Sequence, residues 1–239
     1  MARFRLSLLL PEFPLFLKKN RMDLQRRQLS VSLVLAGVGS LALPRTAAAQ
    51  AWPVEGTNYV RLGQPVPTPS NGKIEVIEFF WYGCPHCNAF EPTLDAWQKT
   101  LPADVAFRRV PVAFSEEPFV AHQRIFYALE SLGLVGSMHR KVFYAIHNER
   151  MRLAKPDEIA AFMAKNGVDS TKFMEAYNSF SVQTKCGQAR QLAQAYKIDA
   201  VPALGVQGRY FISGTMAGSN ERMPAVADAL IQRIRKGAA

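Results

Sequence analysis

Apolar side chains form short runs at the places where the sequence predicts β-strands. Residues 74–80, IEVIEFF, are one such run, and residues 105–112 form the next. Residues 203–206 and 210–213 are expected to form a hairpin late in the chain. Strict alternation in the first run puts Glu78 on the same face as apolar neighbours. This carboxylate therefore belongs to an otherwise apolar row.

The long interval between Phe114 and Val201 carries the apolar spacing of helices almost throughout. A connection between parallel strands requires only one crossover helix, so this interval predicts a helical insertion. Breaks at Gly, Pro and Asp divide it into separate helices. The expected helical segments are residues 118–133, 136–149, 155–167, 169–180 and 181–198, with a last helix from about residue 221 to residue 236.

Two cysteines three positions apart directly follow the first predicted strand. In the stretch WYGCPHCNAF, Cys84 and Cys87 enclose a proline and a histidine. Apolar residues recur every three or four positions from Phe90 onward, which predicts that the cysteines open a helix. Pro85 suits the first helical turn, where its missing N–H removes no hydrogen bond.

This position predicts different chemistry for the two sulfurs. Cys84 would lie at the helix N-terminus, where unpaired N–H groups and the helix dipole favour a thiolate. A protonated His86 would add to that effect. Cys87 would lie on the inner side of the first turn and be less exposed. We therefore expect Cys84 to be the attacking or attacked sulfur and Cys87 the resolving one.

A zinc site and a structural staple are weaker explanations of the pair. The chain holds only three cysteines, whereas structural zinc normally takes four ligands. Three histidines could contribute, but a core or solvated role is favoured for residues in helical segments; they are His122, His139 and His147. A bridge across two residues closes a tiny loop and removes little chain entropy. No metal and no cofactor other than the disulfide is expected.

The first 51 residues have the layout of a secretory signal peptide. A basic start at Arg26 and Arg27 precedes an apolar stretch over residues 29–43 and then small residues up to Ala51. The apolar stretch is shorter than a membrane span. We expect residues 1–51 to be cleaved, with translation starting at Met22, and a twin-arginine signal is the alternative. Either route leads to an oxidising compartment.

Composition agrees with a folded, exported domain. The chain is 49% hydrophobic and 20% charged, which suits one or two globular domains. The formal charge of +10 is concentrated in residues 1–51, which hold eight Lys or Arg and two Asp or Glu. The rest carries 21 basic and 17 acidic residues, a net charge of +4. This balance, without a basic stripe, gives no indication of nucleic-acid binding.

Several of these features together carry a family resemblance. A strand ending in aromatic residues, Cys-Pro-His-Cys opening a helix, and AVPALGV near the C-terminus resemble the thioredoxin superfamily. Within it, residues 52–239 resemble the DsbA-type thiol:disulfide oxidoreductases. The resemblance implies an α/β, thioredoxin-like fold with an inserted all-helical domain. Residues 52–114 and 189–239 would form the thioredoxin-like domain, and residues 115–188 the insertion.

The resemblance also implies the activity and its partners. The chain would donate a Cys84–Cys87 disulfide to folding secreted proteins in the periplasm, through a mixed disulfide. A membrane oxidase of the DsbB kind, linked to quinone, would restore the disulfide. The chain would act as a monomer and without nucleic acid.

The site residues implied by the resemblance lie far apart in the sequence. Val201 and Pro202 would form a cis-proline element facing the dithiol, although an ordinary X–Pro bond is trans. Substrate recognition is expected from apolar contacts near Trp81, Tyr82, Val201 and the loop SGTMAGS, which holds Met216.

Two glutamates match acidic positions beneath the dithiol of DsbA-type proteins, and Arg109 matches a basic position there. Our hypothesis is that a carboxyl with a raised pKa relays the proton of Cys87, and this role is favoured for Glu78. For Glu91 the favoured interpretation is an exposed helix residue, with the relay as the alternative. The alternative for Glu78 is a satisfied residue at a sheet edge.

The third cysteine is the departure from this pattern. Cys186 lies on an apolar stripe of a predicted helix, four residues after Val182. A buried, inert thiol is the favoured interpretation, since free cysteine behaves as a small hydrophobic residue. A third redox centre is the alternative.

Other functions remain open on the sequence alone. A disulfide isomerase or reductase is one, although an isomerase usually needs a dimerisation domain and the segment after Trp52 is too short for it. A cytoplasmic glutathione-dependent isomerase is disfavoured by the export signal. A non-catalytic peptide-binding chaperone would keep its activity with both Cys84 and Cys87 changed to alanine.

Overall fold

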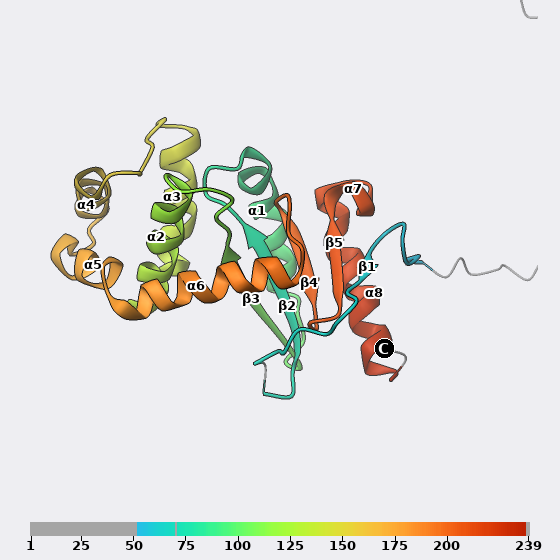
Figure 1. Cartoon of the computed structure of the whole chain (residues 1–239). Coiled ribbons are helices and arrows are strands. Elements are labelled where there is room, and N and C mark those ends of the chain that lie inside the picture. Colours follow the sequence, from blue (N-terminus) through green and yellow to red (C-terminus); the bar gives the residue numbers. More distant parts are fainter. Residues whose placement is uncertain (1–51, 70, 238–239) are drawn as a thin grey trace, which may run out of the picture. The chain divides into compact units, whose positions relative to one another are not determined.

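The computed structural model describes residues 52–69 and 71–237 (Figure 1). The predicted export signal in residues 1–51 and the start at Met22 lie outside the described residues. Within the described ranges, no helix is both long and apolar enough to cross a membrane.

A five-stranded sheet, with the order β1-β5-β4-β2-β3, forms the centre of the described chain. The strand β2 runs parallel to β3 and antiparallel to β4, so it has a partner on both sides. The bounds are β1 (Val60–Arg61), β2 (Ile74–Phe80), β3 (Val105–Pro111), β4 (Ala203–Val206) and β5 (Tyr210–Ser213).

The predicted strands are confirmed, with β3 ending at Pro111, one residue earlier than expected. The strand β1 was not predicted. It has two residues, and it exists because Val60 pairs with Phe211 of β5. Two residues are too few for the alternation of apolar and polar side chains to be recognised in the sequence.

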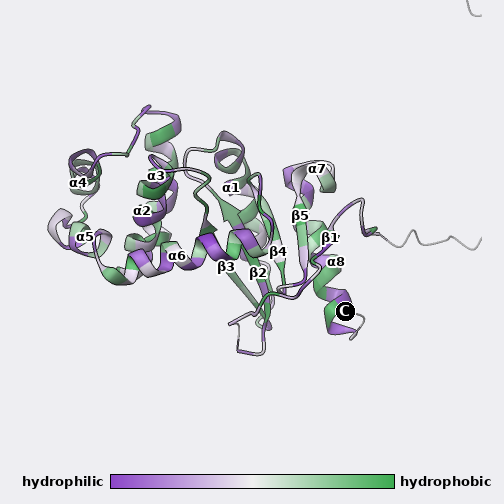
Figure 2. Cartoon of the chain, in the orientation of Figure 1, coloured by the Kyte–Doolittle hydropathy of each residue, from purple (hydrophilic) through white to green (hydrophobic). Residues whose placement is uncertain are grey.

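Both faces of β2 are buried, and they face different hydrophobic clusters. Ile77 and Phe79 belong to a cluster that extends into the helical insertion. Val76 belongs to a second cluster that includes Phe90 of the helix after β2. Because Glu78 alternates in phase with Val76, it faces that helix. Figure 2 shows β2 and β4 as largely hydrophobic, whereas α6 mixes both classes.

Two helices cover the second cluster, and five others form the insertion. The insertion lies between β3 and β4, as the helical spacing predicted. Figure 1 shows α2 to α5 grouped together and α6 running from them back to the sheet. The bounds are α1 (Pro85–Gln98), α2 (Phe119–Ser131), α3 (Val135–His147), α4 (Pro156–Lys165), α5 (Ser170–Tyr177), α6 (Phe180–Ala195) and α8 (Met223–Arg235).

Three further features differ from the expectation: the domain boundary, the SGTMAGS loop and the start of the last helix. The expected domain boundary after residue 188 falls inside α6, and the division into two domains stays a prediction. The loop SGTMAGS contains a short helix, α7 (Gly214–Ala217), capped by the Ser213 hydroxyl. The last helix begins at Met223 rather than near residue 221, because residues Asn220–Arg222 form a 3-10 turn.

Candidate active site

Cys84 holds the N-cap position of α1. The strand β2 ends at Phe80, and Pro85 is the first residue of the helix. The Cys84 sulfur accepts a hydrogen bond from the backbone N–H of Cys87 at 3.3 Å. The backbone N–H of Cys84 donates to the Trp81 carbonyl at 3.0 Å. The prediction that the dithiol opens a helix directly after a strand is therefore confirmed.

The two thiols differ in exposure and in acidity. Within the described structure both are free thiols, so the pair is in its reduced form. Cys84 keeps 7% of its surface exposed, and Cys87 keeps none. A hydrogen bond with the Cys87 side chain, supported by backbone N–H groups and the charge of His86, lowers the pKa of Cys84 to about 6. Burial raises the pKa of Cys87 far above the ordinary range of thiols.

Val201 and Pro202 lie against the dithiol. They precede β4, whose Ala203 pairs with Phe79 near the end of β2. The peptide bond between Val201 and Pro202 is cis, as the resemblance implied. The Cys84 thiol donates to the Val201 carbonyl at 3.4 Å. The antiparallel pairing of two strands distant in sequence thus brings this carbonyl to the sulfur.

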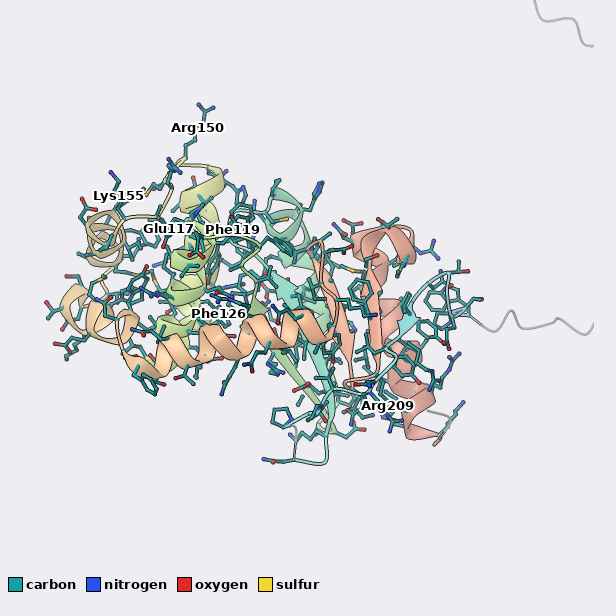
Figure 3. The ribbon with its side chains drawn as sticks, in the orientation of Figure 1. Glu117, Phe119, Phe126, Arg150, Lys155 and Arg209 are labelled. Carbon is teal, nitrogen blue, oxygen red and sulfur yellow. The ribbon has the colours of Figure 1, made fainter. Side chains whose placement is uncertain are left out.

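Trp81 packs against the start of the helical insertion. Its ring stacks on Phe119, labelled in Figure 3, with centroids 4.0 Å apart and planes inclined by 21°. Gly83 permits this position, because a Cβ there would lie 2.3 Å from the Trp81 ring. The tryptophan is partly exposed. Its predicted role in substrate contact stays a prediction.

The prediction for Tyr82 as a groove residue is wrong. Its side chain is fully buried, with its ring between Phe80 and Phe143 and its hydroxyl 2.8 Å from the Nδ1 atom of His139. A buried phenol needs a hydrogen-bond partner, and this partner draws the ring into the core. Met216 lines a pocket of about 690 Å³, which is also lined by the segment just before Val201.

Three charged side chains form a buried cluster, here called the floor, and one of them, Glu78, interacts electrostatically with Cys87. Glu78 of β2 and Arg109 of β3 are register partners, and Glu91 projects from α1. The Arg109 Nε atom lies 3.0 Å from the Glu78 carboxylate, and its Nη2 atom lies 3.0 Å from that of Glu91. The same Nη2 atom lies 2.8 Å from Asp95. A single guanidinium therefore serves three carboxyl groups.

The two buried carboxyls have opposite acidities. Burial, followed by the charge of Glu91, raises the pKa of Glu78 well above its ordinary value. Neither Glu78 oxygen has a hydrogen-bond partner among the described residues, because the nearby Arg109 Nε is not aligned for one. Burial alone would raise the pKa of Glu91 too, but hydrogen bonds and charges from His139 and Arg109 hold it below its ordinary value.

These directions distinguish the two candidate relays. A raised pKa is correct for Glu78 and wrong for Glu91. The exposed position considered for Glu91 and the sheet-edge position considered for Glu78 are wrong as well. Both side chains are fully buried, and β2 is not an edge strand. The difference arises because Glu91 has a second partner, a histidine of the insertion, and Glu78 does not share it.

Sequence reasoning missed His139 as part of this site. The Nε2 atom of His139, on α3, lies 3.0 Å from the Glu91 Oε1 atom. From the sequence, a core or solvated role was expected for this histidine, with a metal ligand as the alternative. Its spacing of four from Phe143 could have indicated burial, and a buried imidazole needs polar partners. The identity of those partners was not visible in the local pattern.

The described residues contain no group of three or more His, Cys, Asp and Glu side chains placed to hold a metal ion. The other two candidate histidines bond to backbone carbonyls. His122 contacts the Arg152 oxygen at 2.9 Å, and His147 contacts the Tyr82 oxygen at 2.8 Å.

Cys186 lies apart from the dithiol, on α6. Only 6% of its surface is exposed, which confirms the predicted burial. Burial raises the pKa of its thiol to about 11, so little thiolate forms at neutral pH. Its inertness stays a prediction.

Known proteins share this architecture. The model of the DSBA-like thioredoxin domain family matches residues 75–231. Thiol:disulfide interchange protein DsbA of Pseudomonas aeruginosa is 44% identical over 208 residues, which cover 87% of this chain and 98% of that protein. The protein of the same name from Azotobacter vinelandii is 42% identical over 212 residues, with 87% and 98% covered.

Solved structures agree with these relatives. A crystal structure of Pseudomonas aeruginosa DsbA matches with a TM-score of 0.75 and 45% identity, covering 77% of this chain and 96% of that one. The oxidoreductase NmDsbA1 from Neisseria meningitidis matches with a TM-score of 0.69 and 28% identity, covering 77% and 95%.

Proposed function

Because this chain belongs to the DsbA family of thioredoxin-like thiol:disulfide oxidoreductases, we propose that Cys84 and Cys87 form the disulfide that it donates. The family acts through its own redox-active disulfide, without an external cofactor. Substrate proteins with free thiols are the electron donors. The roles of the individual side chains follow from their surroundings.

The reaction proceeds by two thiol–disulfide exchanges. A substrate thiolate attacks the Cys84 sulfur, a substrate–Cys84 bond forms, and Cys87 leaves with the electron pair of the broken bond and takes up a proton. A second substrate thiolate then attacks the substrate sulfur of this mixed disulfide. Cys84 leaves as a thiolate. The substrate loses two electrons and gains a disulfide, and the protein ends as the dithiol.

The observation that carries this assignment is the low pKa of Cys84 at the N-cap of α1. A thiol with a low pKa is a good leaving group, so the second exchange is fast and favourable. Cys87 has the opposite character, since its thiolate would be buried. The order of attack, Cys84 first, follows from this contrast and from the exposure of the two sulfurs.

Glu78 is the proton source that the first exchange requires. Cys87 leaves inside the protein, where an unprotonated thiolate is strongly disfavoured. Glu78 interacts electrostatically with Cys87, and its raised pKa favours the protonated carboxyl that can supply this proton. A general acid of this kind lowers the barrier of the leaving step. Glu91, which stays ionised, holds Arg109 in place.

We place this activity in the periplasm, on secreted proteins that fold with free cysteines. The signal-like layout of residues 1–51 supports export, and an exported dithiol meets an oxidising environment. Each cycle leaves a dithiol, so a second protein must remove two electrons. A DsbB-like membrane oxidase linked to quinone suits this step.

Trapping experiments with single-cysteine variants test the assignment. The Cys87→Ser variant keeps the Cys84 thiolate, which attacks a disulfide-containing peptide and stays linked to it because the resolving thiol is gone. The Cys84→Ser variant should form no adduct. Mass spectrometry measures both. Cys186→Ser, in the otherwise unchanged protein, is the control and should transfer disulfides to a reduced peptide at the wild-type rate.

Two results would overturn the proposal. Adducts on Cys87 in the Cys84→Ser variant would reverse the order of attack. Full activity of the double variant Cys84→Ala/Cys87→Ala in promoting refolding would point to a peptide-binding chaperone instead.

A further inference from the structure

We propose that His139 is a positioning residue for the dithiol chemistry, because its hydrogen bond to Glu91, added to that of Arg109, keeps the negative charge on Glu91 and the proton on Glu78. The inference rests on the proposed role of Glu78 as the acid beneath Cys87. It extends the active site into the helical insertion, since His139 lies on α3.

The contact belongs to a continuous row of buried polar groups. The Tyr82 hydroxyl lies 2.8 Å from the Nδ1 atom of His139, and the Nε2 atom of His139 lies 3.0 Å from Glu91. Tyr82 and Glu91 are fully buried, and His139 is 4% exposed. The row continues through Arg109 to Glu78. It therefore joins the residue two positions before Cys84 to the carboxyl beneath Cys87.

One distribution of protons satisfies this row with the fewest buried charges. A neutral imidazole with its proton on Nε2 donates to an ionised Glu91, while Nδ1 accepts from the Tyr82 hydroxyl. The pKa of His139 lies below its ordinary value, mainly through burial, and that of Glu91 is lowered by the contact. The neutral form of His139 is also compatible with the Phe80, Phe126 and Phe143 rings around it.

The same contact explains why the proton remains on Glu78. Both carboxyls depend on the charge of Arg109, which also serves the partly exposed Asp95. Two buried carboxylates beside one guanidinium repel each other, so one of them retains a proton. His139 donates to Glu91 only, and Glu91 takes the negative charge. Without His139, Glu91 would keep only the hydrogen bond from Arg109, and part of the proton would move from Glu78 to Glu91.

The titratable and charged groups facing this pair come from four directions. Arg109 approaches from β3, Asp95 and Cys87 from α1, Tyr82 from the segment between β2 and α1, and His139 from α3 of the insertion. Both His139 and the Arg109 Nη2 atom donate hydrogen bonds to Glu91, whereas the Arg109 Nε atom beside Glu78 is not aligned for one. A change at His139 should therefore redistribute the proton without removing the cation.

The test is the pH dependence of the first exchange. Oxidised protein is mixed with glutathione, and cleavage of the Cys84–Cys87 bond is followed by tryptophan fluorescence, with rates divided by the thiolate concentration. In His139→Leu we expect the rate at pH 7 to fall about tenfold, which is part of the roughly 10²–10⁴-fold that a general acid contributes, because Glu78 keeps its proton only some of the time. The rate should recover as pH falls, because both carboxyls then hold protons.

Three variants make the result specific. His139→Gln keeps an amide donor and should retain most of the rate at pH 7. His122→Leu removes another buried histidine, which bonds to a backbone carbonyl and to no carboxyl, and it should keep the wild-type profile. Thermal unfolding of each variant verifies that it is folded. Glu78→Gln, which cannot donate a proton, should be slow at every pH.

The outcomes separate this inference from the function on which it rests. A wild-type profile for His139→Leu, or an equal loss at every pH, overturns the positioning role. A wild-type rate for Glu78→Gln overturns the proton-donor role while disulfide donation stands. Loss of exchange in Cys84→Ser tests disulfide donation itself.

Discussion

The N-terminal end of α1, here called the open end, and the floor give two cysteine side chains, Cys84 and Cys87, opposite properties. At the open end, Cys84 receives a hydrogen bond from a backbone N–H and keeps some exposure. At the floor, Cys87 is fully buried beside a carboxyl with a raised pKa. Three residues along one helix turn thus separate a stabilised thiolate from a suppressed one. Hydrogen-bond donors at the helix end stabilise the Cys84 thiolate and make it a good leaving group. Burial destabilises the Cys87 thiolate, so this sulfur must receive a proton when it leaves.

The floor also carries most of the buried charge of the site. It consists of Glu78, Glu91 and Arg109, of which only Arg109 has measurable exposure, 10% of its side chain. The open end consists of His86, Pro85 and the Val201 carbonyl, which touch Cys84 or solvent. Changes to the floor should therefore affect stability, and changes to the open end should affect reactivity.

The largest effect is expected when the floor loses its cation. Arg109→Met leaves Glu78 and Glu91 buried without their cation, although Glu91 keeps the His139 contact, and should lower the free energy of unfolding by about 3–5 kcal/mol. Without the cation their folded-state pKa values lie above the unfolded ones, so stability should fall further as pH rises. Urea unfolding at two pH values measures both.

Arg235→Met is the control for that prediction, because Arg235 pairs with Asp104 at the surface. It should cost much less. An equal loss in the two variants would mean that the floor is no more sensitive than a surface pair.

A smaller effect is expected from oxidation, which changes both regions at once. Forming the disulfide removes the Cys84 thiolate and closes only a very short loop, so the reduced protein should melt at the higher temperature at pH 7. This direction is established for DsbA, a strong oxidant whose reduced form is stabilised. At this chain length each kcal/mol corresponds to about 2–4 °C in melting temperature.

The pH dependence of this difference follows from the Cys84 pKa. Its folded value of about 6 lies below the unfolded value of about 8.5. The thiolate contribution is therefore complete above the unfolded value and disappears as pH falls through about 6. Calorimetry of both redox states from pH 5 to pH 9 should show a gap that widens with pH. A higher-melting oxidised form at pH 7 would contradict the role of disulfide donor.

The smallest effect is expected from His86, which touches the open end alone. His86→Ala should raise the pKa of Cys84 only modestly, because the Cys87 hydrogen bond is the largest cause of its lowering and the charge of His86 is a smaller one. Thiolate absorbance against pH measures this. His86→Lys, which restores a positive charge, should return the pKa toward about 6. An unchanged pKa in His86→Ala would assign the shift to hydrogen bonds alone.

The local pattern predicted the open end well. The spacing of Cys84 and Cys87, with a proline at the first helical position, depends on residues within one turn of each other. Capping and helix dipoles act over that same distance. The buried position of Glu78 also followed from alternation along one strand.

The floor was less visible because its partners come from distant elements. Glu91 and His139 are 48 positions apart, and Tyr82 and His139 are 57 apart. No local period predicts that these side chains meet. The acidity of Glu91 and the inward direction of Tyr82 were therefore mistaken, although the presence of acidic residues at the site was correct.

The sequence by itself determined the four longer strands, the longer helices and a dithiol placed at a helix N-terminus, because each depends on short-range periodicity and capping. Only the tertiary structure decided the proton balance beneath that dithiol. The packing of α3 against α1 gives Glu91 a partner, and the pairing of β2 with β3 places one guanidinium between two carboxyls. Acidity in a buried site depends on which charges face each other, and that is settled when distant segments pack together.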